Sequence, residues 1–400
     1  MSLRLPHPRF YYGYIIVAAA FFIVLIGWGT FFTFGVFLKP VGESLPYGRA
    51  ELSGAYSLAT LIAGIGAIAM GKANDVFGPR LVISLCGLTA AMGYLFLSLT
   101  HQLWQFYLAF TIIGVGTAGF FVPPTSTVAR WFTKNRTFMT GLVLIGGSIG
   151  TMVIPKVSSL LITNSGWRSS YAILGCLNLL GMLIFAQTLK PHPEERDASP
   201  EIVKGITFKA ALFTSPFWLL SAIYFSFFFC INLVLAHLVA YATDFGIPLP
   251  TAASLMLVFG GSSIVGRIIM GTLGDRIGNT LTCLICFSLM FLSLLNLLLT
   301  QNLPSLSLST ASLGIAFAGL GALMSPLTAD YFGLKEHGII LGFIYFADNV
   351  GGALGPVLAG TLYDLTQSYT QAFILAAIVS LMGALLILPL RTKSKADFTQ

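Results

Sequence analysis

Charged residues are scarce in this chain of 400 residues. They make up 9% of it, whereas a soluble domain of this length normally holds about 25%. Hydrophobic residues account for 56% of the sequence, and its mean hydropathy is +0.87. Too few polar groups remain to cover a surface that faces water, so most of the surface must face lipid. The net charge of +7 is therefore not the mark of a nucleic-acid-binding protein, and we predict no nucleic-acid partner.

The sequence also lacks a disulfide framework and a metal-binding cluster. The five cysteines all lie within apolar stretches, where neither a zinc site nor a disulfide framework is indicated. Residues 146–150 spell the G-x-S-x-G pattern of a hydrolase nucleophile around Ser148, but no strand is predicted before them. We therefore predict neither a metal nor another cofactor, and we do not expect an enzyme.

Long apolar runs are what the sequence has instead. A membrane-spanning helix needs about 20 predominantly apolar residues. The chain contains twelve such runs, hydrophobic on all sides rather than alternating. Their approximate limits are 11–37, 51–70, 81–99, 104–127, 138–160, 170–189, 216–242, 252–271, 280–300, 305–327, 338–361 and 370–390. The sequence therefore predicts an all-α integral membrane protein with twelve transmembrane helices.

Basic residues fall unevenly on the two sides of the predicted membrane. Sixteen of them lie in the two terminal segments, the central polar segment and the loops of the same side, whereas the opposite loops hold Lys39, Arg49 and Arg168. Since Lys and Arg concentrate in cytoplasmic loops, both termini and the central segment are predicted to be cytoplasmic, which requires an even number of spans. The first apolar run is too long for the core of a cleaved signal peptide, so we expect it to remain as the first helix.

The two halves of the sequence repeat a loop pattern. The pattern recurs at a constant shift of 200 residues, as Gly71, Asp75 and Gly78 in the first half and as Gly271, Asp275 and Gly278 in the second. We interpret residues 1–189 and 211–400 as two six-helix bundles, and the polar residues 190–210 as a cytoplasmic linker. Because both bundles begin on the same side, the repeat is parallel, with pseudo-two-fold symmetry. Such repeats commonly place a substrate site near mid-membrane at their interface.

These residues resemble the major facilitator superfamily of secondary transporters, whose signature loop between the second and third helices reads G-x-x-x-D-x-x-G-x-R. The loop is present as Gly71, Asp75, Gly78 and Arg80, with a degenerate copy at Gly271, Asp275, Arg276 and Gly278. The resemblance implies the major facilitator fold and a gating role for these residues on the cytoplasmic side, where the aspartate can meet a helix N-terminus and an arginine. Arg130, at the end of the fourth span, is the candidate partner of Asp75. The alternative is that these residues are solvated loop charges.

A narrower resemblance begins at Trp131. The run WFTKNR, then Gly141 and Leu142, then glycines at 146 and 150, is similar to the fifth-helix motif of the monocarboxylate transporter family. That motif reads Y-F-x-K-R-R, then G-L and G-S-x-x-G, and the chain departs from it at Trp131, Asn135 and Gly147. The resemblance implies a bacterial relative of the monocarboxylate and oxalate–formate carriers.

Arg267 is one of the few ionisable residues inside the apolar runs. A charge at the centre of a membrane helix costs roughly 2.5–3.5 kcal/mol, so such a residue is a functional candidate by default. Its guanidinium can grip a carboxylate with two parallel hydrogen bonds, and the resemblance implies that it corresponds to the substrate-binding arginine of the eighth helix in monocarboxylate carriers. A structural ion pair or an arginine that reaches the membrane interface is the alternative. Ser263 stands where proton-coupled relatives often carry an aspartate, and we include it among the candidate substrate contacts.

Asp348 lies ten residues into the eleventh span, where a carboxyl group can be charged or neutral depending on its neighbours. It is a candidate proton carrier, a fixed counter-ion to Arg267, or a polar packing residue. His237, near the outer end of the seventh span, is a second proton-coupling candidate or a hydrogen-bonded structural residue. Further candidate substrate contacts are Trp28, Phe120, Phe121, Tyr345 and Asn349.

The sequence thus predicts a secondary transporter that works by alternating access. The predicted substrate is a small monocarboxylate such as lactate or pyruvate, with proton coupling. A proton-driven exporter of drugs or other small solutes and an organic-anion exchanger are the alternatives. The eleventh span lacks the lysine of the oxalate carrier, which argues against a dianion held by two cations. We expect a monomer in the cell (inner) membrane, whose partners are the lipid bilayer, a small organic anion and H+.

Overall fold

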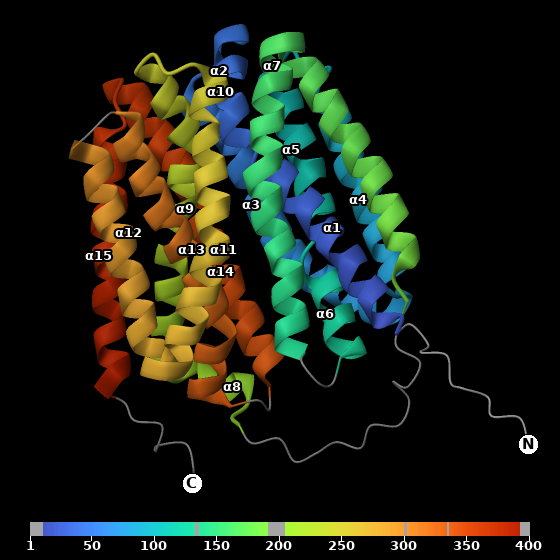
Figure 1. Ribbon diagram of the computed structural model, residues 1–400, viewed down its shortest axis with the longest axis vertical. Helices are drawn as coiled ribbons and strands as arrows, with labels where there is room; N and C mark the ends of the chain where they lie inside the picture. Colours follow the sequence, from blue (N-terminus) through green and yellow to red (C-terminus); the bar gives the residue numbers. More distant parts are fainter. Residues whose placement is uncertain (1–10, 133–135, 191–204, 300–301, 334–335, 393–400) are drawn as a thin grey trace, which may run out of the picture.

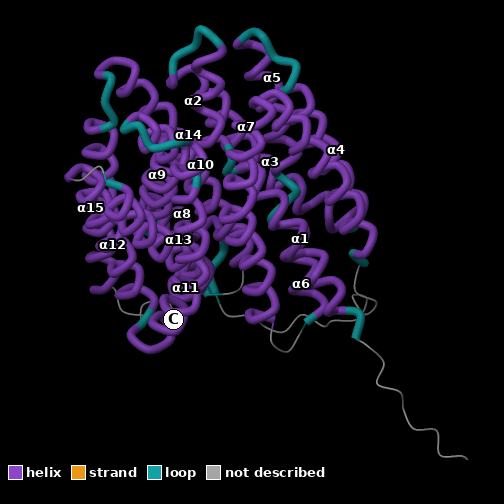
Figure 2. The backbone as a smooth tube through the Cα atoms, turned by 45° about the horizontal axis from the view of Figure 1, so that its top comes forward, coloured by secondary structure: helices purple, strands orange, loops and turns teal. Residues whose placement is uncertain are grey.

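The computed structural model describes residues 11–132, 136–190, 205–299, 302–333 and 336–392. Within these ranges the chain is helical, apart from its loops and one isolated β-bridge between Gly205 and Gly333 (Figure 2). The helices are α1 (Gly13–Phe31), α2 (Phe34–Ser44), α3 (Arg49–Phe77), α4 (Pro79–Leu97), α5 (Leu103–Thr117), α6 (Val122–Trp131), α7 (Arg136–Thr188), α8 (Phe208–Leu212), α9 (Ser215–Asp244), α10 (Leu249–Ala252), α11 (Ser254–Ile277), α12 (Asn279–Leu299), α13 (Leu303–Phe332), α14 (His337–Thr366) and α15 (Thr370–Thr392).

The apolar runs form the membrane-spanning helices. Ten segments of the described residues are long and apolar enough to cross a membrane. One of them, Met139–Thr188, contains a turn at Gly166, whose φ of 77° divides α7 into two spans. The ten segments do not include α3, which is 29 residues long and packs along α14. We count α3 as a further span. The twelve spans predicted from the sequence are thus all found in the described part of the chain, and the all-α membrane fold is confirmed.

The fourth predicted span, residues 104–127, is interrupted in the structure. α5 ends at Thr117 and α6 begins at Val122, with Pro123 and Pro124 in the first turn of α6. Proline has no N–H to donate, so it is tolerated in a first turn but opposes a continuous helix. The interruption places Phe121 at a corner of the chain, a feature that hydropathy does not reveal.

The two halves of the chain lie side by side. Helices α1 to α7 gather on one side of the molecule and α9 to α15 on the other (Figure 1). The halves meet along three helix pairs: α3 with α14, α7 with α11, and α2 with α9. A Cβ on Gly260 of α11 would lie 2.7 Å from the Ser148 carbonyl oxygen of α7, and one on Gly360 of α14 would lie 2.7 Å from the Cα of Ala50 in α3. Small residues therefore let the two backbones touch, and Ser148 belongs to a helix contact rather than to a nucleophile elbow.

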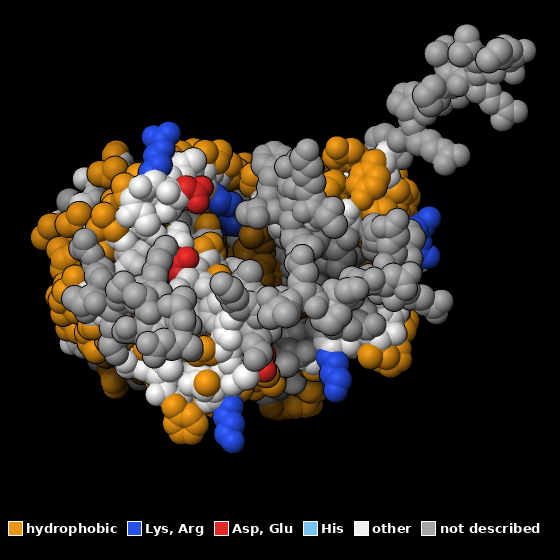
Figure 3. Space-filling view, turned by 90° about the horizontal axis from the view of Figure 1, so that it is seen from below, with side chains coloured by type: hydrophobic (Ala, Val, Ile, Leu, Met, Phe, Trp, Pro, Cys, Tyr) orange, Lys and Arg blue, Asp and Glu red, His pale blue; other side chains and the backbone are white. Residues whose placement is uncertain are grey.

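The two ends of the molecule differ in how the halves meet. At the lower end in Figure 1, which we name the linker end, α7 finishes at Thr188 and α8 begins at Phe208. At the opposite end, named the far end, α2 finishes at Ser44 and α9 at Asp244. Seen from the linker end, the molecule is hollowed between its halves (Figure 3). The conformation is thus open toward the linker end.

Burial separates central from peripheral helices. In α9, 83% of the residues of the apolar stretch are buried, against 39% in α15. α15 leaves Ile378, Leu381 and Leu385 exposed. Exposed leucines and isoleucines on an outer helix are stable only against lipid, so α9 belongs to the centre of its half and α15 to the lipid-facing side.

Candidate functional site

Arg267 is held on α11, one turn before Gly271. Its side chain is half-buried, and its Nε atom is buried without a hydrogen-bond partner. No ion pair joins Arg267 to a carboxylate in the described part of the chain. A buried N–H without an acceptor is costly. An anion that reached this nitrogen would therefore be stabilised.

Ser263 precedes Arg267 by one helical turn and is fully buried. Its hydroxyl donates a hydrogen bond to the Gly260 carbonyl oxygen at 2.8 Å. The hydroxyl oxygen keeps lone pairs with which it can accept a further hydrogen bond. Residues four apart on a helix lie on one face, so Ser263 and Arg267 are neighbours on α11.

Asp348 and Asn349 lie in different surroundings on α14. Asp348 is 4% exposed, and its Oδ1 atom has no hydrogen-bond partner. Asn349 donates from Nδ2 to the Tyr345 carbonyl oxygen at 2.9 Å and packs against Gly64 of α3. Asn349 thus forms part of the contact between the halves, whereas Asp348 is a buried carboxyl group without a partner.

Arg267 and Asp348 are not paired with each other in this conformation. Among the described residues the ion pairs are those of Asp244 with Lys39 and Arg49, all at the far end. Within the described residues, Arg267 and Asp348 therefore have no counter-ion on the membrane-spanning helices.

Three aromatic rings form a continuous stack between the halves. Trp28 of α1 stacks on Phe121, with ring centroids 5.5 Å apart, and Phe121 stacks on Tyr345 of α14 at 5.8 Å. Phe120 turns the other way: it is 1% exposed and packs so closely on α1 that a Cβ on Gly27 would lie 2.5 Å from its ring. The corner between α5 and α6 thus sends one ring into the stack and the next into the core of the N-terminal half.

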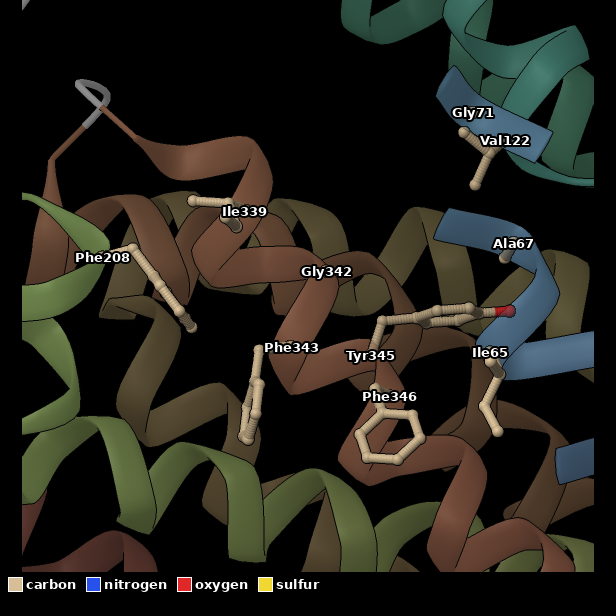
Figure 4. Close-up of a pocket in the computed structure, with 10 residues that line it drawn as sticks. All are labelled: Ile65, Ala67, Gly71, Val122, Phe208, Ile339, Gly342, Phe343, Tyr345 and Phe346. Atoms are coloured by element: carbon tan, nitrogen blue, oxygen red, sulfur yellow. The ribbon is translucent and has the colours of Figure 1, made fainter. Parts of the chain in front are cut away.

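A cavity of about 640 Å³ opens beside this stack. Figure 4 shows the Tyr345 ring reaching from α14 toward Ile65 and Ala67 of α3. The lining residues come from both halves and are almost entirely apolar: Ile65, Ala67, Gly71, Val122, Phe208, Ile339, Gly342, Phe343, Tyr345 and Phe346. The cavity can hold apolar groups but offers few hydrogen bonds beyond that of the tyrosine hydroxyl.

The two signature loops share one backbone conformation. Gly78 has φ of 80° and Gly278 has φ of 90°, in the region that favours glycine. Each glycine ends one helix next to the start of another, α3 to α4 and α11 to α12. Gly71 lines the cavity, and Asp275 and Arg276 are exposed at the end of α11. The backbone conformation of the two turns therefore requires glycine at positions 78 and 278.

The remaining signature residues are only partly described. Arg80 donates from Nε to the Leu189 carbonyl oxygen at 2.6 Å, so it binds the end of α7 inside its own half. Gly271 has no heavy atom within 4 Å of the position its Cβ would take. Asp75 and Arg130 lie on α3 and α6, but their side chains are outside the described residues. The gating role of the loops stays a prediction.

His237 lies in the interior of the far end and is completely buried. Its Nδ1 is 2.9 Å from the Tyr369 hydroxyl, and its Nε2 is 2.9 Å from the Pro356 carbonyl oxygen and 3.3 Å from Ser53 Oγ. Both ring nitrogens are therefore occupied. This is the arrangement of a hydrogen-bonded structural histidine.

The described part of the chain contains no candidate metal site, since no three His, Cys, Asp or Glu side chains in it come together in a way that would hold a metal ion. Four cysteines are buried, as the sequence suggests, whereas Cys176 is exposed on α7. The expectation of a buried position was wrong for Cys176, because a thiol, like an alkyl group, is stable where the helix faces lipid.

Sequence reasoning assigned no role to several polar residues at the far end. Arg49, Asp364 and Lys156 all bind residues of the opposite half. The available signal was the small number of basic residues on that side of the membrane, since Lys39 and Arg49 are two of three. Their partners could not be identified, because they are distant in sequence.

Comparison with known proteins agrees with this architecture. The family model of the Major Facilitator Superfamily matches residues 17–303 and 238–400. Similar curated proteins include monocarboxylate transporter 13 of Bos taurus, 26% identical over 96% of this chain and 90% of its own length. Monocarboxylate transporter 12 of Rattus norvegicus is 30% identical over 76% of this chain and 70% of its own. The uncharacterized MFS-type transporter YcxA of Bacillus subtilis (strain 168) is 24% identical over 94% of this chain and 95% of its own.

A solved structure shows the same fold. The crystal structure of a bacterial homolog of the human lysosomal transporter Spinster, inward-facing and unoccupied, matches with a TM-score of 0.76 at 15% identity, covering 96% of this chain and 97% of that one. At this identity the likeness concerns the fold alone. The helix arrangement, the family match and the related sequences lead to one conclusion: the chain belongs to the major facilitator superfamily and, within it, to the family of the monocarboxylate transporters, and it is a multi-pass membrane transporter of small solutes rather than an enzyme.

Proposed function

We propose that the transported solute is a small monocarboxylate of the lactate or pyruvate type, carried together with a proton by alternating access. The observation that supports this most directly is the buried Nε of Arg267, which has no partner within the described chain. One unpaired guanidinium suits one carboxylate, because its fork binds both carboxylate oxygens. The names of the related monocarboxylate transporters 12 and 13 support the same substrate class.

Asp348 is the residue that we propose to carry the proton. Its Oδ1 is buried and has no hydrogen-bond partner, so a proton added to this carboxyl group displaces no existing bond. His237 is the weaker candidate, since both of its nitrogens already have partners. A carboxyl group whose surroundings change between two conformations binds a proton in one and releases it in the other.

The other candidate contacts take complementary roles in this proposal. The stacked rings of Trp28, Phe121 and Tyr345 would enclose the apolar part of the acid, and Ser263 and Asn349 would supply polar contacts. Phe120 would not contact the acid; its packing on α1 would fix the corner of the chain that positions Phe121. The gate at the linker end would be formed by the two signature loops.

The charge distribution supports an orientation for the carrier. Arg80, Lys190, Lys209 and Arg276 all lie at the linker end. By the positive-inside rule we propose that this end is cytoplasmic, with both chain termini on the same side, in the cell (inner) membrane. The conformation described above would then be open to the cytoplasm.

Uptake by purified protein in proteoliposomes tests the proposal. Labelled lactate and pyruvate are supplied outside, with and without an inward proton gradient, and we expect the gradient to increase uptake. Arg267→Ala should lower uptake at limiting substrate roughly 100-fold or more, since two hydrogen bonds to a charged group contribute about 1.5–3 kcal/mol each. Lys209→Ala, which removes an exposed cation from α8, is the matched control and should transport normally. Asp348→Asn should abolish the response to the gradient.

The same assay separates the alternatives. Normal uptake of every acid by Arg267→Ala would exclude the proposed anion site. The apolar lining of the cavity is the observation that favours an exporter of drugs or other apolar solutes, and inhibition by lipophilic cations but not by lactate analogues would indicate it. Uptake that requires an unlabelled organic acid preloaded inside the vesicles, and that does not respond to the proton gradient, would indicate an organic-anion exchanger.

A further inference from the structure

A cluster of charges joins the two halves at the far end. Arg49, the first residue of α3, faces Asp244, the last residue of α9: Nη1 is 2.8 Å from Oδ2, and Nη2 donates to Oδ1 at 2.9 Å. Lys39 of α2 adds its Nζ at 3.2 Å from the same Oδ1. Burial alone would lower the pKa of Arg49, but Asp244 and Tyr369 raise it above its ordinary value. The guanidinium therefore stays charged and is held against the carboxylate by one hydrogen bond and a second close N–O contact, and a hydrogen bond to an ionised partner is stronger than one between neutral groups.

Aromatic rings of the C-terminal half surround the same guanidinium. Its Cζ lies 3.8 Å from the ring centroid of Tyr363, a cation–π contact, and its Nη1 donates to the Tyr369 hydroxyl at 2.5 Å. Burial raises the pKa of Tyr369, and Arg49 offsets this only in part, so the hydroxyl keeps its proton. Because the Pro356 carbonyl can only accept, neutral His237 carries its proton on Nε2, and Nδ1 accepts from Tyr369. The hydrogen bonds thus run in one direction, from the arginine into the core of the other half.

The backbone at the start of α3 is bound as well. The Asp364 carboxylate, near the end of α14, accepts from the Arg49 N–H at 3.0 Å and from the Ala50 N–H at 2.8 Å. These N–H groups have no partner within their own helix, and a carboxylate at a helix N-terminus is stabilised by the helix dipole. One half therefore caps a helix of the other.

We propose that Lys39, Arg49, Asp244, Asp364 and Tyr369 form a latch, the far-end latch, with Arg49 as the positioning residue that holds this end closed while the linker end is open. Each of its bonds crosses from one half to the other. The latch must therefore come apart whenever the far end opens, whichever solute is carried. Breaking it exposes the arginine and both aspartates to water, so its strength sets the ratio between the two open conformations.

The neighbouring contact at the far end is of a different kind. Lys156 of α7 donates from Nζ to the Pro250 carbonyl oxygen and to Ser254 Oγ, the latter at 2.7 Å. Its partners are neutral, whereas Arg49 pairs with the Asp244 carboxylate. Since bonds between charged partners are the stronger ones, Arg49 is the residue whose removal should release this end.

Spin-label distances across the far end test the latch without any substrate. Glu43 of α2 and Thr366 of α14 are exposed and lie on opposite halves, so both are replaced by cysteine and labelled. Cys176→Ala removes the exposed native thiol. Pulsed EPR of the full chain in lipid nanodiscs then gives the populations of short and long distances. Arg49→Met should raise the ratio of long to short distances roughly tenfold, as expected when a half-buried arginine loses an ion pair, a cation–π contact and a hydrogen bond together.

Two further variants make the result specific. Arg49→Lys keeps the charge but loses the fork, so it should give an intermediate ratio, and Asp244→Asn, which removes the anionic partner of both Lys39 and Arg49, should shift the ratio in the same direction as Arg49→Met. Arg168→Met is the matched control. Arg168 also lies at the far end over an aromatic ring, Trp167, and it binds the Thr100 carbonyl oxygen within its own half. This variant should leave the distances unchanged.

Several outcomes would overturn the latch. One is a folded Arg49→Met protein, verified by its thermal unfolding, with the distances of the parent. Another is an equal shift in Arg168→Met, which would assign the effect to general loosening. If Arg49→Met did not fold, parent-like distances in both Arg49→Lys and Asp244→Asn would overturn it. None of these results depends on the substrate, so they do not bear on the proposed monocarboxylate.

Discussion

The far end and the linker end join the same two halves with opposite chemistry. At the far end a half-buried arginine, a lysine and two aspartates connect α2 and α3 to α9 and α14. Toward the linker end the same pair, α3 and α14, faces a cavity lined by apolar residues such as Ile65 and Phe343. Directional bonds close the far end, whereas apolar side chains line the opening toward the linker end.

This difference shows how one helix pair can serve two conformations. α3 touches α14 near Ala50, whereas near Gly71 both helices line the cavity that lies between them. A rocking motion about the middle of the pair, where Gly64 meets Asn349, would exchange the two situations. Rocking of rigid repeats around a central site is the usual form of alternating access.

We expect the largest effect from a substitution that pushes the backbones of α3 and α14 apart at the far end. In Gly360→Ala the new methyl group would lie 2.7 Å from the Arg49 carbonyl oxygen and from the Ala50 backbone, which cannot move aside as a flexible side chain would. We expect the closed far end to lose about 1–3 kcal/mol, seen as longer distances between labels at positions 43 and 366. Gly321→Ala is the control, since no atom lies within 4 Å of its Cβ position. Equal distances in both variants would contradict the prediction.

Weakening the stack near the cavity should have an intermediate effect. Tyr345→Ala removes the last ring of the stack with Phe121, and an aromatic pair contributes about 0.5–1.5 kcal/mol beyond burial. The apparent KM for the transported acid should rise roughly 2–10-fold, while the spin-label distances at the far end stay unchanged. Tyr345→Phe keeps the ring and should transport like the parent. If it lost as much affinity as the alanine variant, the hydroxyl rather than the stack would matter.

A contact inside one half should have the smallest effect. Trp131→Phe removes the N–H that donates to the Lys190 carbonyl oxygen at 2.7 Å but keeps an aromatic ring at the end of α6. We expect the free energy of unfolding to fall by about 1 kcal/mol, the usual value for one hydrogen bond, measured as a slightly lower Tm. Uptake and the far-end distances should not change, because the bond does not cross between the halves. A shift in the distances would show that the N-terminal half does not move as a rigid unit.

Much of the fold could be predicted because lipid imposes a simple rule. Runs of about 20 apolar residues must become helices that satisfy their own backbone, and all twelve predicted spans were found among the described residues. The rule does not predict where a helix is interrupted within a span. The corner at Phe121 depends on Pro123 and Pro124 and on the neighbours that accept the interruption.

The candidate site was predictable only as a set of residue types. A charged residue inside an apolar run is rare and costly, so Arg267 and Asp348 could be selected from the sequence. Their relation could not: the sequence allowed an ion pair between them, and this conformation contains none within the described residues. Phe120 and Phe121 are neighbours of the same type, yet one packs in the core and the other stacks against the opposite half.

The sequence by itself determined the class of the protein, its twelve helices, its repeat and the few ionisable groups that the membrane-spanning helices contain, because transfer into lipid penalises each polar group regardless of its partners. The tertiary structure alone decided which of these groups have partners. Arg49 and Asp244 are 195 residues apart and Arg49 and Asp364 are 315 apart. Contacts of this kind depend on how two bundles are placed against each other, and a local pattern contains no information about that placement.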